Sequence, residues 1–500
     1  MERIKTKNNV RLENVKTKKQ LSLQRFFGGN MDYGRDSFWY DDEMLNSVSR
    51  YEDMLKNDAR YFFDVHEFED IIDYYLDSEN FAEAATAAKY AARIYPMASS
   101  IQLRLAEILI DKGQPVKALN VLKKIEHLES GEYAIYLLRG AALNMMGKPR
   151  EAQRQFEKAI ELADENKTEV LYNIGMSFER INQHKVALKY FMKVHALEPE
   201  NYFVYYDLAY CYERLNELDK SIVYYKKYLD EDPFSEHVWY NLGIVYNKKG
   251  DNELSLEAYD YAIAINPDYS SAHFNKANTL SLLERYREAI ETYQEFLGIE
   301  PDNAAAYCYT GECYEWLEEY GMAKIQYIKS ISLDEQFADA WFGLGVVQSQ
   351  EGSHEDAVRS ILRALESDND NTEYLFAVAS EYASLQKYKK AIPIFKKLLQ
   401  LIQNDVNVWD CFAQIYAKQE AFADALKIIN EALLYNPDSA LLRYRMAAYY
   451  LLNNEDRKGL TVLEETLKTN PEESESFFDV FETDDADHEI MKLMNKYRKK

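Results

Sequence analysis

Apolar and polar positions along the chain repeat with a period of 34 residues. Val204–Asn216 reads VYYDLAYCYERLN and Val238–Gly250 reads VWYNLGIVYNKKG, so equivalent residues of the two stretches stand 34 apart. Prolines mark the same period, at Pro199, Pro233, Pro267 and Pro301. If each repeat is numbered so that its proline is position 32, twelve consecutive units cover Val65–Glu473, with one extra residue near 164–168.

Within each unit the large apolar residues are spaced as on two amphipathic helices. Positions 4, 7, 8 and 11 share one helical face, and positions 20, 24 and 27 share another. Gly113, Gly147 and Gly250 fall between them, where the end of a helix needs a positive φ. Pro115 and Pro149 follow at the start of a second helix, which tolerates proline. The pattern predicts an all-α chain of antiparallel helix pairs.

Small residues occupy positions 8 and 20 of almost every unit. Of these twenty-four residues, twenty-three are Gly, Ala or Ser, and the exception is Ile72 in the first unit. Two antiparallel helices pack closely only where small residues face the crossing. A single helix pair cannot bury its apolar face alone, so we expect the units to stack into a solenoid.

One unit displays the complete set of repeated residues: Trp239, Leu242, Gly243 and Tyr246, followed by Tyr259, Ala262 and Pro267. This set resembles the tetratricopeptide repeat (TPR) motif, and the resemblance extends over about four-fifths of the chain. It implies a right-handed superhelix of helix pairs whose first helices line a concave groove. It also implies that this groove binds proteins.

The regions outside the repeats are predicted to cap them. Residues 31–64 are expected to hold an N-terminal capping helix, and residues 474–500 C-terminal capping helices. The N-terminal stripe consists of Met44, Leu45, Val48, Tyr51 and Leu55. Residues 1–30 carry eight Lys/Arg and two acidic residues, so we interpret them as a disordered basic arm. The alternative is that Met31 is the true start.

Charge narrows the class of partner. The chain has 85 Asp and Glu against 59 Lys and Arg, a net charge of −26, which disfavours nucleic acid and favours basic protein segments. No stretch is apolar enough to predict a membrane span or a membrane partner. The N-terminus has no apolar core of a secretory signal, so the sequence predicts a cytoplasmic protein.

Catalytic motifs are missing from the sequence. There is no GxxxxGK[ST], GxSxG or HExxH, and no two of the eight histidines have metal-ligand spacing on one helix. Four cysteines are too few for a disulfide framework in a chain of 500 residues. We therefore expect neither an enzyme nor a cofactor or metal site.

An aromatic residue followed by Asn or Asp occupies positions 5 and 6 of four successive units. An asparagine both donates to and accepts from a peptide backbone, and aromatic rings supply contact area. With polar and aromatic residues one turn later, the candidate groove comprises Tyr172, Asn173, Tyr206, Asp207, Tyr210, Tyr240, Asn241, Phe274, Asn275 and Asn278. This ladder suits an extended peptide and is similar to the asparagine ladder in the TPR superhelix of a protein glycosyltransferase. The alternative is that an average repeat of the family carries the same residues for packing.

A second candidate surface is acidic and lies in the first two units. It comprises Glu69, Asp70, Asp73, Asp77, Glu107 and Asp111, with Arg104 as its only strong base. Such a surface either docks a Lys/Arg-rich segment or is simply a solvated acidic face. None of the twelve residues at position 5 is Lys or Arg, so the carboxylate clamp of chaperone-binding TPR domains is not expected.

These features together predict a non-catalytic scaffold or adaptor that binds an extended peptide or a partner protein in the groove. Two alternatives are a self-assembling structural solenoid and an accessory subunit of an enzyme complex. Light scattering separates self-assembly from the adaptor, because only self-assembly gives a mass that rises with protein concentration.

Overall fold

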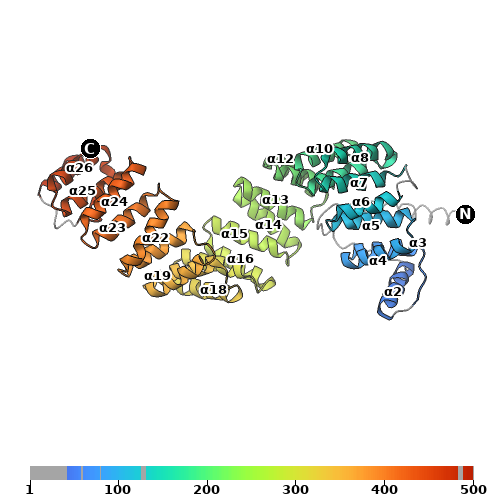
Figure 1. The fold of residues 1–500 in the computed structure, drawn as a ribbon, viewed down its shortest axis with the longest axis horizontal. Coiled ribbons are helices and arrows are strands. Elements are labelled where there is room, and N and C mark those ends of the chain that lie inside the picture. The colour runs from blue at the N-terminus through green and yellow to red at the C-terminus, as the bar shows by residue number, and fades with distance from the viewer. Residues whose placement is uncertain (1–41, 58–59, 79, 126–130, 482–487, 499–500) are drawn as a thin grey trace. The chain divides into compact units, whose positions relative to one another are not determined.

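The computed structural model describes residues 42–57, 60–78, 80–125, 131–481 and 488–498. In these ranges the regular secondary structure is helical and no strand occurs, as the sequence pattern predicts. The predicted basic arm and Met31 lie outside the described residues. Two compact units divide the chain, residues 1–265 and 266–500, and each is described by itself (Figure 1).

The first unit contains thirteen described α-helices and one short 3-10 helix. They are α2 (Asp42–Asn57), α3 (Val65–Asp77), α4 (Phe81–Ile94), α5 (Ser99–Asp111), α6 (Pro115–Ile125), α7 (Tyr133–Met145), α8 (Pro149–Leu162), η1 (Asp164–Asn166), α9 (Lys167–Glu179), α10 (His184–Leu197), α11 (Val204–Arg214), α12 (Leu218–Glu231), α13 (Glu236–Lys249) and α14 (Asn252–Ile265). The extra residue in the sequence register coincides with η1, which adds one turn between two repeats.

The second unit continues the same alternation. Its helices are α15 (Ser270–Leu282), α16 (Tyr286–Ile299), α17 (Ala304–Trp316), α18 (Tyr320–Leu333), α19 (Ala338–Gln350), α20 (His354–Leu365), α21 (Thr372–Ser384), α22 (Tyr388–Leu401), α23 (Val406–Ala417), α24 (Phe422–Tyr435), α25 (Ala440–Leu452), α26 (Asp456–Thr469), η2 (Pro471–Glu473), α27 (Glu475–Phe478) and α28 (His488–Arg498).

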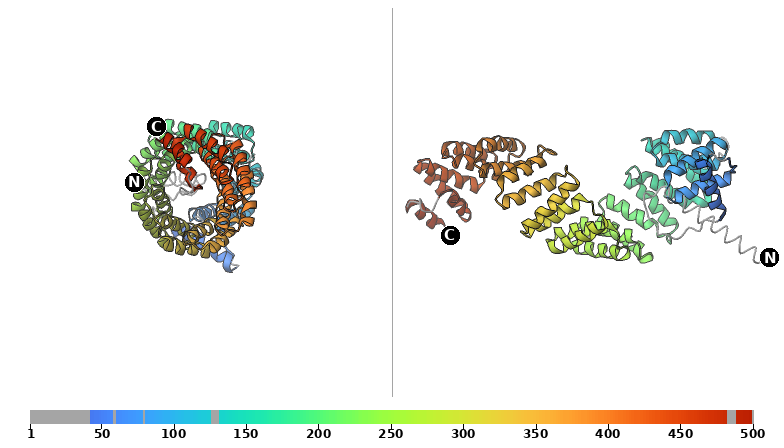
Figure 2. Two further views of the ribbon diagram at one scale, coloured as in Figure 1. Left: turned by 90° about the vertical axis from the view of Figure 1, so that its left-hand side faces the viewer. Right: turned by 90° about the horizontal axis from the view of Figure 1, so that it is seen from below.

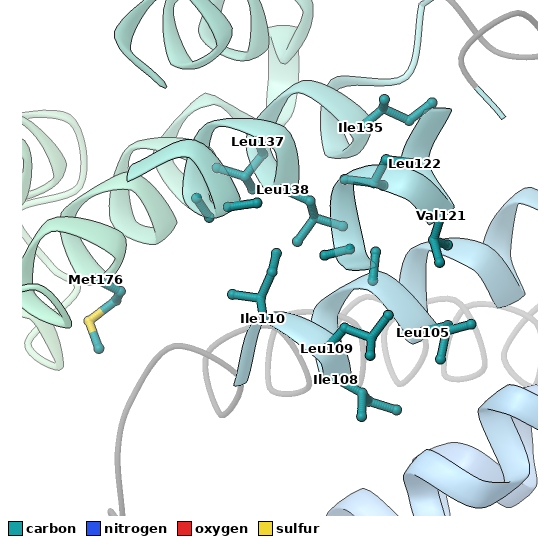
Figure 3. Close-up of a cluster of buried hydrophobic side chains, with 14 of the residues drawn as sticks. Leu105, Ile108, Leu109, Ile110, Val121, Leu122, Ile135, Leu137, Leu138 and Met176 are labelled. Carbon is teal, nitrogen blue, oxygen red and sulfur yellow. The ribbon is translucent and has the colours of Figure 1, made fainter. Parts of the chain in front are cut away.

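Helices α3 to α26 form twelve consecutive pairs, each with an odd-numbered first helix and an even-numbered second helix. Within each unit the helices of a pair pack on one another and on the next pair (Figure 2). Figure 3 shows one such core in the first unit, where Leu109 of α5, Leu122 of α6 and Leu138 of α7 meet. Stacking therefore buries the apolar face that a single pair leaves exposed.

The turn inside each pair from α5–α6 onward places one residue in the left-handed conformation. Gly250 has a φ of 87° there, as its position in the sequence predicts. The same turn position carries Glu284 at 60° and Gln386 at 56° in other repeats. A glycine is therefore the sequence signal of this turn in only some of the repeats.

Glycine at position 8 leaves room for the aromatic ring at position 24. A Cβ on Gly243 would lie 2.5 Å from Cε1 of the buried Tyr259, and a Cβ on Gly175 would lie 2.6 Å from Cε1 of Phe191. Small residues thus stand at the helix crossing, as the sequence pattern predicts. The structure shows that the nearest group is this ring.

The Gly243→Ala variant is expected to lose about 1–3 kcal/mol of stability, because the new methyl group would overpack against the Tyr259 ring. Gly298→Ala is the matched control, since a Cβ at Gly298 in α16 meets nothing within 4 Å. Helix propensity alone should make this control up to about 1 kcal/mol more stable. Urea unfolding followed by circular dichroism measures both changes, and equal midpoints for the two variants would contradict this packing.

Side chains at position 4 donate hydrogen bonds to backbone carbonyls in the turn between neighbouring pairs. The indole Nε1 of Trp239 donates to the Pro233 carbonyl at 2.9 Å, and Nε1 of Trp409 donates to the Gln403 carbonyl at 2.8 Å. Other residues make the same contact six residues back: Tyr205 to Pro199, Trp341 to Glu335 and Arg443 to Pro437. The sequence pattern indicates only that this residue is large and repeated, and the structure adds its hydrogen bond.

The two ends of the described chain bury apolar residues. In α2, Met44, Val48 and Tyr51 are buried, whereas Leu45 and Leu55 of the predicted stripe are exposed. At the other end, Phe477, Phe481, Ile490 and Met494 form one buried cluster with residues of α25 and α26. The N-terminal stripe is thus narrower than its sequence predicts.

Candidate functional site

Positions 5 and 6 of successive first helices contact each other. Asn241 Nδ2 of α13 donates to the hydroxyl of Tyr206 in α11 at 3.0 Å. Tyr172 of α9 hydrogen-bonds the carboxylate of Asp207 in α11 in the same register. The aromatic–Asn/Asp pairs therefore join neighbouring repeats, and this packing role coexists with any role in binding.

Three residues of the predicted ladder offer no groove surface. Tyr172, Asn173 and Asp207 are only 7%, 1% and 2% exposed, which corrects the expectation that they face an open groove. The cause is long-range packing around α9, where Val170 to Phe178 are all buried. Arg180 at the end of this helix donates to Asp111 of α5 at 2.6 Å, although the two residues are 69 apart in sequence.

The remaining ladder residues of the first unit keep part of their surface. Tyr206, Tyr210, Tyr240 and Asn241 are all half-buried. The hydrogen bond to Tyr206 uses only the amide nitrogen of Asn241. These side chains on α11 and α13 are therefore the accessible part of the ladder in this unit.

The last predicted pair lies in the second unit. Phe274, Asn275 and Asn278 of α15 are half-buried. The Asn278 Oδ1 accepts a hydrogen bond from Tyr293 at 2.5 Å, and the ring of Phe274 lies 5.1 Å from the ring of Phe296. As in the first unit, each of these side chains combines internal contacts with exposed surface.

The predicted acidic surface is partly neutralised from within. Arg104 donates to both carboxylate oxygens of Asp73, from Nε at 3.0 Å and from Nη2 at 2.8 Å, and its Nη1 lies 3.9 Å from Glu69. An oxygen of Asp70 lies 3.9 Å from Nδ1 of His66. Asp77 is half-buried at the end of α3. Ion pairs within the chain thus neutralise much of the negative charge that was expected to dock a basic partner.

Burial changes the ionisation of two further acidic residues of this surface. Loss of hydration raises the pKa of Glu107 to about 8, and the nearby Arg104 opposes this change. Burial also raises the pKa of Asp111 to about 6, against the opposing charge of Arg180. At neutral pH a large fraction of Glu107 therefore carries no charge.

Two neighbouring carboxylates lie on α9 and α11: Asp207 belongs to the predicted ladder, whereas Glu179 does not. Burial and then the neighbouring charge of Asp207 raise the pKa of Glu179 well above its usual value. Burial raises the pKa of Asp207 to about 7, although the hydrogen bond from Tyr172 opposes it. Glu179 stands at position 12 of its repeat, seven residues after Tyr172 and so on the same face of α9, and this was the signal available in the sequence.

No group of three or more His, Cys, Asp or Glu residues in the described ranges could hold a metal ion. The four cysteines are all unpaired thiols, and Cys211, Cys308 and Cys313 are buried. Burial raises the pKa of Cys313 to about 11, so its thiol is not activated as a nucleophile. No helix among the described residues is long and apolar enough to cross a membrane.

Models of tetratricopeptide repeats match several parts of the chain. A tetratricopeptide repeat-like domain model matches residues 74–177. Three tetratricopeptide repeat models match residues 168–201, 204–235, 238–269, 258–291, 338–371 and 372–405. No curated protein sequence matches the chain significantly.

Solved structures of repeat proteins also resemble parts of this chain. YrrB, a TPR protein with an unusual peptide-binding site, is 24% identical over 37% of this chain and 96% of its own, with a TM-score of 0.34. A tetratricopeptide repeat protein from Parabacteroides merdae is 16% identical over 49% of this chain and 98% of its own, with a TM-score of 0.39. The C-terminal part of a TPR repeat-containing protein from Cytophaga hutchinsonii is 16% identical over 48% and 98%, with a TM-score of 0.42.

Proposed function

Because the chain belongs to the tetratricopeptide repeat family, we propose that it is a non-catalytic scaffold that binds an extended peptide or a partner protein along its first helices. The family is typically a protein-interaction fold. The partner contacts in the first unit are assigned to Tyr206, Tyr210, Tyr240 and Asn241, and those in the second unit to Phe274, Asn275 and Asn278.

One observation carries the proposal: aromatic and amide side chains at equivalent positions of successive first helices stay half-buried and keep part of their surface exposed. Tyr210 and Tyr240 present ring surface, which supplies contact area with little loss of rotamer freedom. The Asn241 carbonyl oxygen accepts no hydrogen bond within the described part of the chain, so it remains for a peptide N–H.

A selection experiment tests this proposal. A displayed library of random decapeptides is selected on the intact protein, and the enriched peptides are then measured against Tyr210→Ala/Tyr240→Ala/Asn241→Ala. We expect binding at least tenfold weaker than to the wild type, because contact residues of this kind contribute about 1 kcal/mol or more each. The helical circular dichroism signal should be unchanged, since all three side chains are partly exposed.

The matched control removes apolar surface from second helices. Val223→Ser in α12 and Leu254→Ser in α14 alter side chains that are 50% and 42% exposed, and this variant should bind like the wild type. Selection of no peptide, or equal binding by the groove variant and the control, would exclude the proposed surface.

A further inference from the structure

The tyrosine at position 24 reaches through the repeat toward the side chains of the first helix. In the second unit, the hydroxyl of Tyr293 donates to Asn278 at 2.5 Å. In the next repeat, the hydroxyl of Tyr327 donates to Glu315 at 2.8 Å. The acceptors stand at positions 9 and 12 of the preceding first helix. A position-24 hydroxyl therefore has an internal partner in these repeats.

Tyr225 of α12 is one of the equivalent tyrosines in the first unit, and it differs. Its side chain is completely buried, yet its hydroxyl has no hydrogen-bond partner among the described residues. The hydroxyl lies near Tyr206, Glu213, Tyr210 and Glu179, whose charges act on it. An unmade hydrogen bond at a buried hydroxyl costs about 1–3 kcal/mol, so a ligand that hydrogen-bonds the Tyr225 hydroxyl would be stabilised there.

Two further carboxylate oxygens are also unpaired, one on Glu179, whose charge acts on Tyr225, and one on Asp207, whose charge acts on Glu179. Glu179 Oε2 and Asp207 Oδ2 are buried and have no hydrogen-bond donor within the part of the chain that the structure describes. The charge of Asp207 acts on Glu179, so the two carboxylates are close neighbours. Buried acceptors that repel each other are stabilised by a donor that carries positive charge.

Aromatic rings complete the surroundings. The ring of Tyr206 lies 5.8 Å from that of Tyr225. Tyr210 is half exposed and its phenol lies near Glu179, so this residue connects the buried oxygens with the surface. The faces of tyrosine rings attract ammonium and guanidinium groups, so these rings would act on a bound cation together with the carboxylates.

We infer that Glu179, Asp207 and Tyr225, whose unpaired oxygens are closed off from solvent in the free chain, form with Tyr206 and Tyr210 a pocket that opens to the basic side chain of a lysine or arginine in a bound peptide. This inference rests on the proposed function and adds the chemistry of one subsite. Its residues belong to α9, α11 and α12, whereas the acidic surface, which Arg104 and Arg180 partly neutralise, belongs to α3 and α5.

Arg214 at the end of α11 is the internal competitor for this pocket. Its charge acts on Tyr210, but it has no carboxylate within 4 Å among the described residues, and its side chain is exposed. An Arg214→Gln variant should therefore keep or strengthen the preference for basic peptides. If the Arg214→Gln variant lost the preference for basic peptides, the pocket would not be the site that binds the basic side chain.

The peptide selection described above also tests the pocket when it is run at about 0.5 M salt, where charges more than a few ångströms apart are screened. Peptides enriched on the wild type should share a Lys or Arg at one position. Exchange of that residue for norleucine should weaken binding about tenfold, the usual scale of one charge-assisted hydrogen bond.

Two variants decide whether the pocket causes the preference. Glu179→Gln/Asp207→Asn should select peptides with no basic position, while still binding peptides through its tyrosines. Asp230→Asn/Glu231→Gln removes two charges from the exposed end of α12 and should keep the basic position. If both variants lose the preference for a basic residue, the overall negative charge of the protein causes this preference and the pocket is excluded.

The outcomes separate this inference from the proposed function. Enrichment of peptides without any basic position on the wild type would overturn the pocket and leave the scaffold intact. Absence of any enriched peptide would overturn both. Spermidine serves as a probe for binding of a free cation. The pocket holds a small cation if spermidine binds the wild type and does not bind Glu179→Gln/Asp207→Asn. If norleucine exchange also has no effect on peptide binding, the assignment of the pocket to a peptide side chain is wrong.

Discussion

Replacing Asp207 by asparagine is expected to stabilise the protein, and the gain is expected to grow by an amount on the order of a few kcal/mol as the pH rises from 5 to 8. Burial raises the pKa of Asp207 from near 4 to about 7. Between these two values the folded protein binds a proton that the unfolded chain does not. The free energy of unfolding of the wild type therefore falls as the pH rises from about 4 to about 7. Asparagine does not ionise, so the Asp207→Asn variant does not show this fall.

Urea unfolding at pH 5, 6, 7 and 8 measures the difference between the variant and the wild type. The introduced amide keeps an oxygen that can accept the hydrogen bond from Tyr172, so the Asp207→Asn variant preserves this contact. Asp230→Asn, which alters an exposed carboxylate, is the control and should show no such growth with pH. A constant difference between Asp207→Asn and the wild type across this range would contradict a buried carboxylate with a raised pKa.

Other buried groups change the absolute pH dependence, and so the comparison must be made between variant and wild type. Glu107, with its pKa of about 8, acts in the same direction as Asp207. His184 and His195 act in the opposite direction. Burial lowers their pKa, so stability is lost as the pH falls below about 6.5, where the unfolded chain takes up a proton first.

Arg445→Met is expected to destabilise the second unit by about 3–5 kcal/mol, because it leaves the buried carboxylate of Asp410 without a counter-charge. The two side chains are only 5% and 9% exposed and form two hydrogen bonds, Nε to Oδ1 at 2.8 Å and Nη2 to Oδ2 at 3.1 Å. Arg445 also donates to the Ser476 carbonyl and to Asp479, so it joins the C-terminal segment to α25.

The double variant Arg445→Met/Asp410→Leu is the matched control. It removes both charges and should recover most of the lost stability, because a well-packed apolar pair often replaces a buried ion pair without cost. Hydrogen exchange should show the damage of the single variant first around residues 406–481, since each repeat contacts mainly its neighbours. Equal destabilisation by the single and double variants would show that packing around Arg445 matters and its charge does not.

Much of the fold follows from the sequence because its determinants are local. The 34-residue period, the small residue at position 8 and the ring at position 24 predict helix pairs, and every described repeat adopts them. Helical periodicity and turn chemistry act over a few residues, so they can be read directly. The left-handed turn residues Glu284 and Gln386 were not predictable from composition, because the turn geometry of the repeat outweighs their own preferences.

The candidate site was predictable only in part. The sequence by itself determined that an aromatic residue and Asn or Asp recur at positions 5 and 6. Only the tertiary structure decided that Tyr172 and Asn173 are buried while Tyr240 and Asn241 stay half exposed, although both pairs read Tyr-Asn. The physical reason is that α9 lies among helices whose ends meet across two repeats, as the contact between Arg180 and Asp111 shows, and such long-range packing leaves no trace in a local motif.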